Sequence, residues 1–181
     1  MDRDGSSRTG TVHTPTGRRL RRAGSSGALL AACALLLPAA LADARIVPQK
    51  GIMGINLNMT RSQVVHKKGK PDSEKVVNNE ILGRQRIMRY GRTRVGFSGT
   101  RRGARVIGIT THDRRQRTRS GVGIGSSEAA VRAGVGGIHC RTEFGSRHCF
   151  KGRFRAGERV TDFSLSARDH VTRVTVAIVI D

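Results

Sequence analysis

Residues 52–71 read IMGINLNMTRSQVVHKKGKP, and this stretch contains the signals for one short helix together with its start and its end. Thr60 is suited to the N-cap position, and Gln63 stands three residues later, where its side chain can bond back to the Thr60 backbone. Val64 gives the helix an apolar side, and Gly69 is a typical residue for its end. The pattern predicts a helix that is capped by Thr60 and packs through Val64 against the rest of the domain.

Short runs of alternating apolar and polar residues follow this helix, and such runs are typical of antiparallel strands. A basic turn that contains two glycines separates the second run from the third. The first half is therefore expected to be a helix followed by a small meander, with strands at residues 86–90, 93–97 and 104–110.

A similar pattern begins again 67 positions later. Residues 121–131 align with residues 54–64, and Ser127 then occupies the capping position of Thr60. In addition to a hairpin that contains two cysteines, strands are expected after this second helix at residues 151–154, 159–165 and 171–180. We predict an α+β fold of two tandem repeats, each a short helix or helical hairpin packed on a small antiparallel sheet.

The first 42 residues have the order of features that is typical of a secretory signal peptide. A basic region comes first, and residues 28–42 are then almost wholly apolar and end in the sequence ALA, which signal peptidase accepts. A membrane span needs about 20 apolar residues, and this run is shorter. We expect cleavage after Ala42 and a secreted or cell-envelope location. A lipid on Cys33 is the alternative, because this cysteine closes the lipobox-like sequence LAAC.

After cleavage, Cys140 and Cys149 remain as one pair within the sequence HCRTEFGSRHC. They can form a disulfide across two antiparallel strands that are joined by a two-residue turn at Phe144–Gly145. The competing interpretation is a zinc site that also uses His139 and His148. Neighbouring side chains of a strand point to opposite faces, so each His-Cys pair would be divided between two sides of the sheet. We therefore predict the disulfide and no metal site.

The chain is strongly basic. Six of its 34 Lys and Arg residues and two of its 13 Asp and Glu residues precede residue 43, so residues 43–181 carry a net charge of +17. Such a charge attracts polyanions such as nucleic acid or anionic envelope polymers, without choosing among them. The basic segment at 114–120 is interpreted as a solvated linker, or alternatively as a polyanion-binding stripe with contacts at Arg114, Arg115, Arg117 and Arg119.

Aromatic side chains are scarce, with one Tyr, five Phe and no Trp, which argues against recognition of single-stranded nucleic acid by base stacking. Each half can bury only a modest core, so the disulfide is expected to matter for stability.

The predicted organisation is a signal peptide at 1–42, an N-terminal linker at 43–51, repeat 1 at 52–113, a basic linker at 114–120 and repeat 2 at 121–181.

Residues 57–64 and 69–71 read LNMTRSQV and GKP. They resemble the L-x-M-T-x-x-x-V … G-x-P signature of the SmpA/OmlA (BamE) envelope proteins. The resemblance covers about residues 50–70, with a weaker echo at residues 121–134. The same helix-on-sheet unit occurs twice in the β-lactamase-inhibitor protein (BLIP) family, where each repeat carries a small disulfide. The resemblance implies a secreted or envelope protein that binds another protein.

Some features depart from these families. Asn58 stands where they usually have Gly, and after signal cleavage only the second half of this chain contains cysteines. The inhibitor family binds through aromatic-rich loops and an acidic finger, whereas residues 98–103 form a basic tip without an aromatic cluster. We therefore do not expect β-lactamase inhibition. If this tip contacts a partner, Arg101 and Arg102 are the residues expected to do so.

We expect no enzymatic activity and no cofactor. His66 lies beside a lysine at the polar end of the predicted helix, and His112 ends a predicted strand without a serine or cysteine in a nucleophile-elbow context. The glycines at 121–125 precede a helix but lack the Lys-Ser/Thr continuation of a phosphate-binding loop. No nucleophile, metal set or cofactor loop occurs together with a general base.

Three functions remain, in order of preference. The first is a secreted or envelope-associated binding module whose concave sheet face receives an unidentified protein partner. The second is an extracellular polyanion binder, a hypothesis that is based on the net positive charge. The third is an inhibitor of a secreted enzyme, in which Phe144 at the hairpin tip would be the anchor residue.

Overall fold

The structure is a computed structural model that describes residues 45–80 and 82–180. The expected signal peptide at 1–42, its cleavage after Ala42 and the alternative lipid on Cys33 lie outside the described residues. No helix within residues 45–80 and 82–180 is long and apolar enough to cross a membrane.

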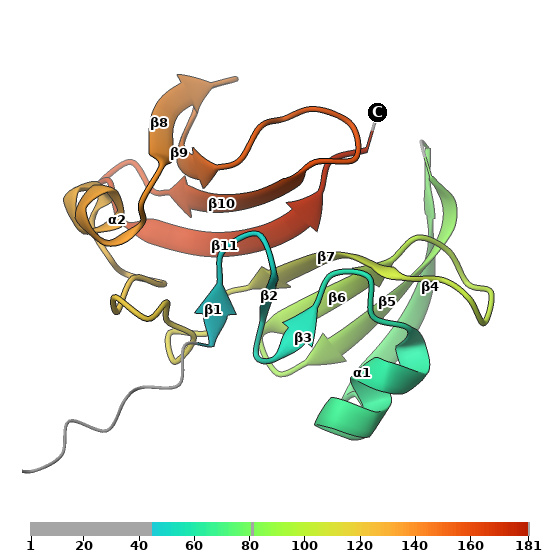
Figure 1. Ribbon diagram of the computed structural model, residues 1–181. Coiled ribbons are helices and arrows are strands. Elements are labelled where there is room, and N and C mark those ends of the chain that lie inside the picture. Colours follow the sequence, from blue (N-terminus) through green and yellow to red (C-terminus); the bar gives the residue numbers. More distant parts are fainter. Residues whose placement is uncertain (1–44, 81, 181) are drawn as a thin grey trace, which may run out of the picture. The chain divides into compact units, whose positions relative to one another are not determined.

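Eight antiparallel strands form one large sheet (Figure 1), in the order β4-β5-β6-β7-β11-β10-β9-β8. The strands are β4 (Ser73–Asn79), β5 (Gly83–Tyr90), β6 (Thr93–Phe97), β7 (Val106–Thr111), β8 (Ile138–Glu143), β9 (Ser146–Lys151), β10 (Arg159–Leu165) and β11 (Val171–Ile178). Each half of the sheet is a meander of four consecutive strands. The halves join where β7 pairs with β11, with Ile109 opposite Val176.

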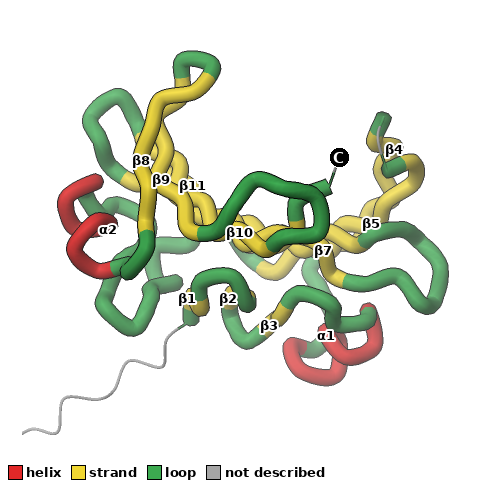
Figure 2. Tube along the Cα trace, turned by 45° about the horizontal axis from the view of Figure 1, so that its top comes forward, coloured by secondary structure: helices red, strands yellow, loops and turns green. Residues whose placement is uncertain are grey.

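Three very short strands and two short helices complete the described part of the chain. They are β1 (Ile46–Val47), β2 (Gly51–Ile52), β3 (Ile55–Asn56), α1 (Arg61–Lys68) and α2 (Glu128–Gly134). β1, β2 and β3 form a second, three-stranded sheet. Figure 2 shows these three strands and α1 on one side of the large sheet.

The fold class predicted from the sequence, α+β with helix-on-sheet repeats, is wrong. The described residues are mostly β, because α1 has eight residues, α2 has seven, and the strands of both halves belong to one continuous sheet. A separate four-stranded meander would leave the backbone groups of β7 and of β11 unpaired at an edge. Their pairing satisfies these groups and replaces the two small sheets that we expected with one large one.

Both helices begin where the sequence predicts. Thr60 accepts a hydrogen bond from the backbone N–H of Gln63 at 3.3 Å, and the Gln63 side chain accepts one from the Thr60 backbone at 2.8 Å. In α2 the Ser127 hydroxyl accepts from the backbone N–H of Ala130 at 3.2 Å. α1 is followed by Gly69 with φ of 79°, a conformation that few other residues adopt without strain. The capping prediction is confirmed.

One face of the large sheet carries the hydrophobic core. Ile46 and Ile52 from the short strands, Val64 from α1 and Val131 from α2 are all fully buried. They belong to one cluster with side chains of the large sheet, including Met88, Val95, Phe97, Ile109, Phe163, Val174 and Val176. Part of the segment at 43–51, expected as a linker, therefore forms strands that contribute to the core.

The predicted strands agree with the structure unevenly. β6 and β10 occupy the predicted residues, and β5, β7 and β11 overlap them. The strand predicted at 151–154 is wrong, because the chain turns out of β9 at Gly152, where φ is 103° and a Cβ atom would lie 2.3 Å from the Arg159 carbonyl oxygen. No sequence pattern predicts β4, because its residues are almost all exposed and show no apolar alternation.

Candidate functional site

The cysteine hairpin has the predicted register. Cys140 lies directly opposite Cys149, and their sulfur atoms form a disulfide of 1.97 Å. The turn is made by Phe144 and Gly145, both with positive φ, as a type I′ hairpin turn requires. Glu128 places a carboxylate oxygen within 4.8 Å of both sulfurs, but the sulfurs are bonded to each other. The alternative zinc interpretation is therefore wrong.

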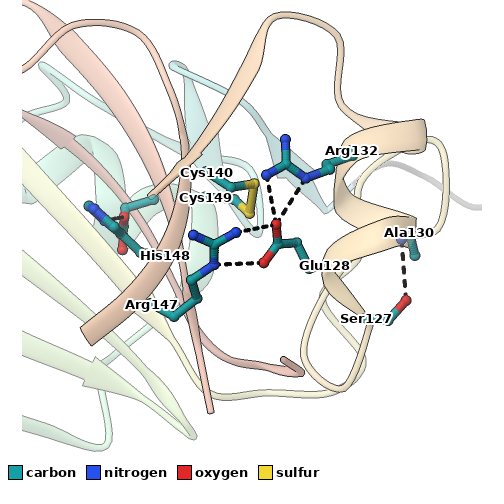
Figure 3. The surroundings of a disulfide bond; sticks show 9 residues. Ser127, Glu128, Ala130, Arg132, Cys140, Arg147, His148 and Cys149 are labelled. Carbon is teal, nitrogen blue, oxygen red and sulfur yellow. Dashed lines mark hydrogen bonds and ion pairs between the residues drawn. A yellow bond between two sulfur atoms is a disulfide. The ribbon is translucent and has the colours of Figure 1, made fainter. Parts of the chain in front are cut away.

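Glu128 ties α2 to this hairpin. Figure 3 shows its carboxylate between the guanidinium groups of Arg132, on the same helix, and Arg147, on β9. Each arginine donates to Oε1 at 2.7 Å. The hydrogen bond from Arg147 and that from Arg132 lower the pKa of Glu128, although burial acts in the opposite direction. The spacing of four residues between Glu128 and Arg132 is readable in the sequence, but the contact with Arg147 depends on the tertiary fold.

His148 points to the other side of the hairpin. Its Nδ1 lies 2.6 Å from Oδ1 of Asp162, and the Ser164 hydroxyl donates to Oδ2 of Asp162 at 2.9 Å. Its Nε2 is buried, has no hydrogen-bond partner among the described residues, and lies 3.3 Å from Glu143. As expected for adjacent strand positions, His148 and Cys149 lie on opposite faces of the sheet. Sequence reasoning missed this cluster, because its members come from three different strands.

The face of the large sheet that points away from the core is only partly buried, and we call it the open face. Two adjoining hollows lie on it, of about 670 Å³ over β4–β7 and about 790 Å³ over β8–β11. Ala177, Ile178 and Ile180 line both, so the two hollows adjoin at the end of β11, and we call them together the groove. Two neighbouring rows of open-face residues line the groove, and they contain Ile87, Arg89, Arg94, Gly96, Gly108, Thr110, Val160, Asp162, Thr175 and Ala177.

The floor of the groove is made of small residues. Gly96, Gly108 and Ala177 are consecutive partners across β6, β7 and β11, with Ile87 and Val160 at the two ends of the same row. A Cβ atom on Gly108 would approach no atom closer than 3.8 Å, so the glycines leave space above the centre of the sheet. A row of this kind gives a shallow trough with apolar ends.

A charged row runs beside this floor. Arg89, Arg94, Thr110, Thr175 and Asp162 are consecutive partners on β5, β6, β7, β11 and β10. The two threonine hydroxyl groups lie 3.1 Å apart. Within this row, cationic groups lie over the first half of the sheet and a carboxylate lies over the second half, where Arg147 and Arg173 also line the groove.

Two phenylalanines close the groove near β8. The ring centroids of Phe150 and Phe154 lie 4.9 Å apart in an edge-to-face arrangement, and the guanidinium of Arg141 lies 4.7 Å from the Phe150 centroid. Phe154 remains 48% exposed. This end of the open face offers an aromatic surface next to a cation.

The structure does not bring the predicted partner contacts together. Phe144 is fully exposed at the tip of the β8–β9 hairpin and lines the hollow over β8–β11. Arg101 and Arg102 are exposed in the loop between β6 and β7, on the other half of the sheet. Their role in binding stays a prediction.

The four arginines of the basic segment at 114–120 do not act alike. Arg115 donates through Nε to Asp113 at 3.2 Å, and Arg117 donates through Nη1 to the Gly121 carbonyl and to Ser126, both at 3.2 Å. Arg114 and Arg119 are exposed, and their side chains form no such bond within the described residues. Half of the predicted polyanion stripe therefore holds the connection between β7 and α2 in place.

No family model matches the sequence, and no curated protein matches it. A solved structure of a DUF4309 family protein (YjgB) from Bacillus subtilis subsp. subtilis str. 168 is 14% identical, covers 76% of this chain and 90% of that chain, and has a TM-score of 0.42. An extracellular protein containing a SCP domain from Bacillus anthracis str. Ames is 8% identical over 67% of this chain, which spans 44% of that chain, with a TM-score of 0.43. Scores at this level carry no argument about function. Neither protein is described as a BamE or BLIP protein, and that resemblance stays a prediction.

Proposed function

We propose that this protein is a non-enzymatic binding module, secreted or in the cell envelope, and that its open face receives a protein partner. The observation that carries the proposal is the groove, two adjoining hollows that together extend over both halves of the sheet, with a floor of small residues. The domain leaves this face of the sheet uncovered, and the face is hollowed and partly apolar. A partner protein can bury a surface of this kind.

Exposed apolar side chains along the groove support this role. Val77 on β4, Phe154 in the β9–β10 loop and Ile180 after β11 are each more than a third exposed and line the two hollows. Lys75, Arg89 and Arg94 line the hollow over β4–β7, whereas the hollow over β8–β11 is lined by charges of both signs, so a partner with a matching charge pattern is oriented by this difference. The exported location is supported by the disulfide, because such bonds persist in oxidising compartments.

A capture experiment tests the proposal. Protein produced from the full chain and recovered after export is immobilised, incubated with native envelope extract, and washed at low and at high salt. A protein partner held by apolar burial is retained at high salt, because salt screens charge contacts and does not weaken apolar burial. Retention of anionic polymer alone, and only at low salt, would contradict the proposal and favour the polyanion alternative.

A further inference from the structure

Three arginines and a histidine line a separate hollow of about 540 Å³ at the edge of the open face. Arg89 comes from the end of β5, Arg92 from the two-residue turn that follows, and Arg94 from β6. His112 follows β7, where its backbone N–H donates to the Arg92 carbonyl at 3.1 Å. We call these four residues the arginine pocket.

The arginine pocket places like charges against one another. Arg89 and Arg94 are direct cross-strand partners on the same face, an arrangement that destabilises a sheet. Arg92 adds a third charge from the turn between them. Nδ1 of His112 lies 3.1 Å from the Thr172 carbonyl, which fixes the ring on β11. The sheet therefore holds three guanidinium groups around one hollow, and their mutual repulsion is unfavourable for folding.

No carboxylate among the described residues forms an ion pair with these arginines. Asp72 lies beside the same turn, but its Oδ2 accepts from the backbone N–H of Gly91 at 2.5 Å. Arg89 donates through Nε to the Gly91 carbonyl at 2.9 Å, and no side-chain bond is formed by Arg92 or Arg94 within residues 45–80 and 82–180. The guanidinium groups therefore keep most of their donors available.

Seven other arginines of the described part form ion pairs with carboxylates. On the core side of the same strands, Glu74 of β4 accepts from Arg61 at 2.9 Å and also pairs with Arg86. Several further carboxylates are used in the same way, in the pairs Arg115–Asp113, Arg132–Glu128, Arg147–Glu128, Arg141–Glu143 and Arg153–Glu158. The arginine pocket stands out as a concentration of positive charge that the described residues leave unneutralised.

We propose that the arginine pocket binds a compact oxyanion with more than one negative charge, through phosphate or carboxylate oxygens. Guanidinium groups match both oxygen geometries with two parallel hydrogen bonds each. An anion with two or more charges would neutralise the Arg89–Arg94 repulsion and make use of Arg92 at the same time. This site needs no protein partner, although Arg89 and Arg94 also border the groove.

Calorimetric titration with pyrophosphate and, separately, with citrate tests this proposal at one fixed ionic strength. Either probe is expected to bind the wild-type protein, and the better of the two identifies phosphate or carboxylate as the preferred chemistry. Arg94→Gln is expected to weaken binding at least tenfold. The matched control is Arg168→Gln, which removes the same charge from an exposed position in the β10–β11 turn and is expected to change the affinity less than twofold.

Thermal unfolding provides a second readout that does not depend on calorimetric heats. Pyrophosphate is expected to raise the Tm of the wild type and of Arg168→Gln but not that of Arg94→Gln, because a ligand stabilises only the form that binds it. Without ligand, Arg94→Gln is expected to melt no lower than the wild type, since it removes a like-charge pair. Binding of neither probe, or equal weakening by both substitutions, would overturn the proposal and leave only a diffuse attraction to net charge.

Discussion

Asp113 illustrates how single residues hold the connection between the two halves of the sheet. Its Oδ1 accepts from the backbone and the side chain of Arg115 at 3.0 and 3.2 Å, and its Oδ2 accepts from the Gln116 amide at 3.1 Å. Burial alone would raise the pKa of Asp113, but these bonds together lower it to about 2. Next to it, the Arg117 carbonyl accepts from the Ile46 backbone, so the same connection anchors β1.

Replacing Asp113 by Ala is expected to lower the free energy of unfolding at neutral pH by about 1–3 kcal/mol, because buried donors lose their acceptor. A carboxylate with a lowered pKa in the folded state stabilises above its unfolded pKa of about 3.9 and loses this contribution as the pH falls. The difference between wild type and Asp113→Ala should therefore shrink between about pH 4 and pH 2. Urea unfolding at several pH values measures it.

The control for this prediction is Glu80→Ala, which removes an exposed carboxylate between β4 and β5. It is expected to change the free energy of unfolding by less than about 0.5 kcal/mol. Equal effects of the two substitutions, or a difference for Asp113→Ala that does not depend on pH, would show that the bonds of Asp113 are not stabilising.

Residues whose roles depend on near neighbours in the chain were predictable, and the others were not. The caps Thr60 and Ser127 and the turn at Phe144 are determined by positions within three or four residues. The contacts of Glu128 with Arg147 and of His148 with Asp162 join different elements, 19 and 14 residues apart. A single sequence holds no signal for such pairs, so the contacts of His148 and Asp162 on the open face could not be predicted.

At the scale of elements, the β8–β9 hairpin combines a short disulfide loop with a place at the edge of the sheet. The cysteines are nine residues apart, so the bond restricts only a small part of the unfolded chain. Cys149 is fully buried against the core, and Glu128 adds an ionic tie to α2. The hairpin is therefore held by the covalent bond, by packing and by one salt bridge.

Replacing both Cys140 and Cys149 by Ala is expected to lower stability by roughly 2–3 kcal/mol, the value that chain entropy assigns to a loop of this length. A lowered Tm in circular dichroism would report it, and treatment of the wild type with a reducing agent should give a similar decrease. An unchanged Tm in the double variant would mean that the disulfide does not contribute to stability.

The whole molecule is where prediction from sequence failed most clearly. The runs that became β6 and β10 were visible as strands, but nothing in them indicates that β7 pairs with β11 to make one sheet of eight strands. Strand order is a property of long-range pairing, whereas alternation of residues reports only the local backbone and which face is buried. The composition gives the number of glycines but not their positions in the sheet. Only the fold shows that Gly96 and Gly108 lie side by side on the open face.

The continuous sheet is also what gives the molecule its candidate binding surface. The groove crosses the junction of β7 and β11, so neither half contains it alone. Its central floor residue on β11 is Ala177, which both hollows share. The proposed function therefore requires that a partner occupies the centre of the open face.

The most direct test compares Ala177→Tyr with Ala133→Tyr for binding to the protein that the wild type retains at high salt. Both substitutions add the same neutral ring, one in the groove floor and the other on the exposed surface of α2. The account predicts that Ala177→Tyr weakens binding more than about tenfold, or by more than about 1.4 kcal/mol, while Ala133→Tyr binds like the wild type and both variants remain folded. Unchanged binding by Ala177→Tyr would contradict the claim that the open face receives the partner.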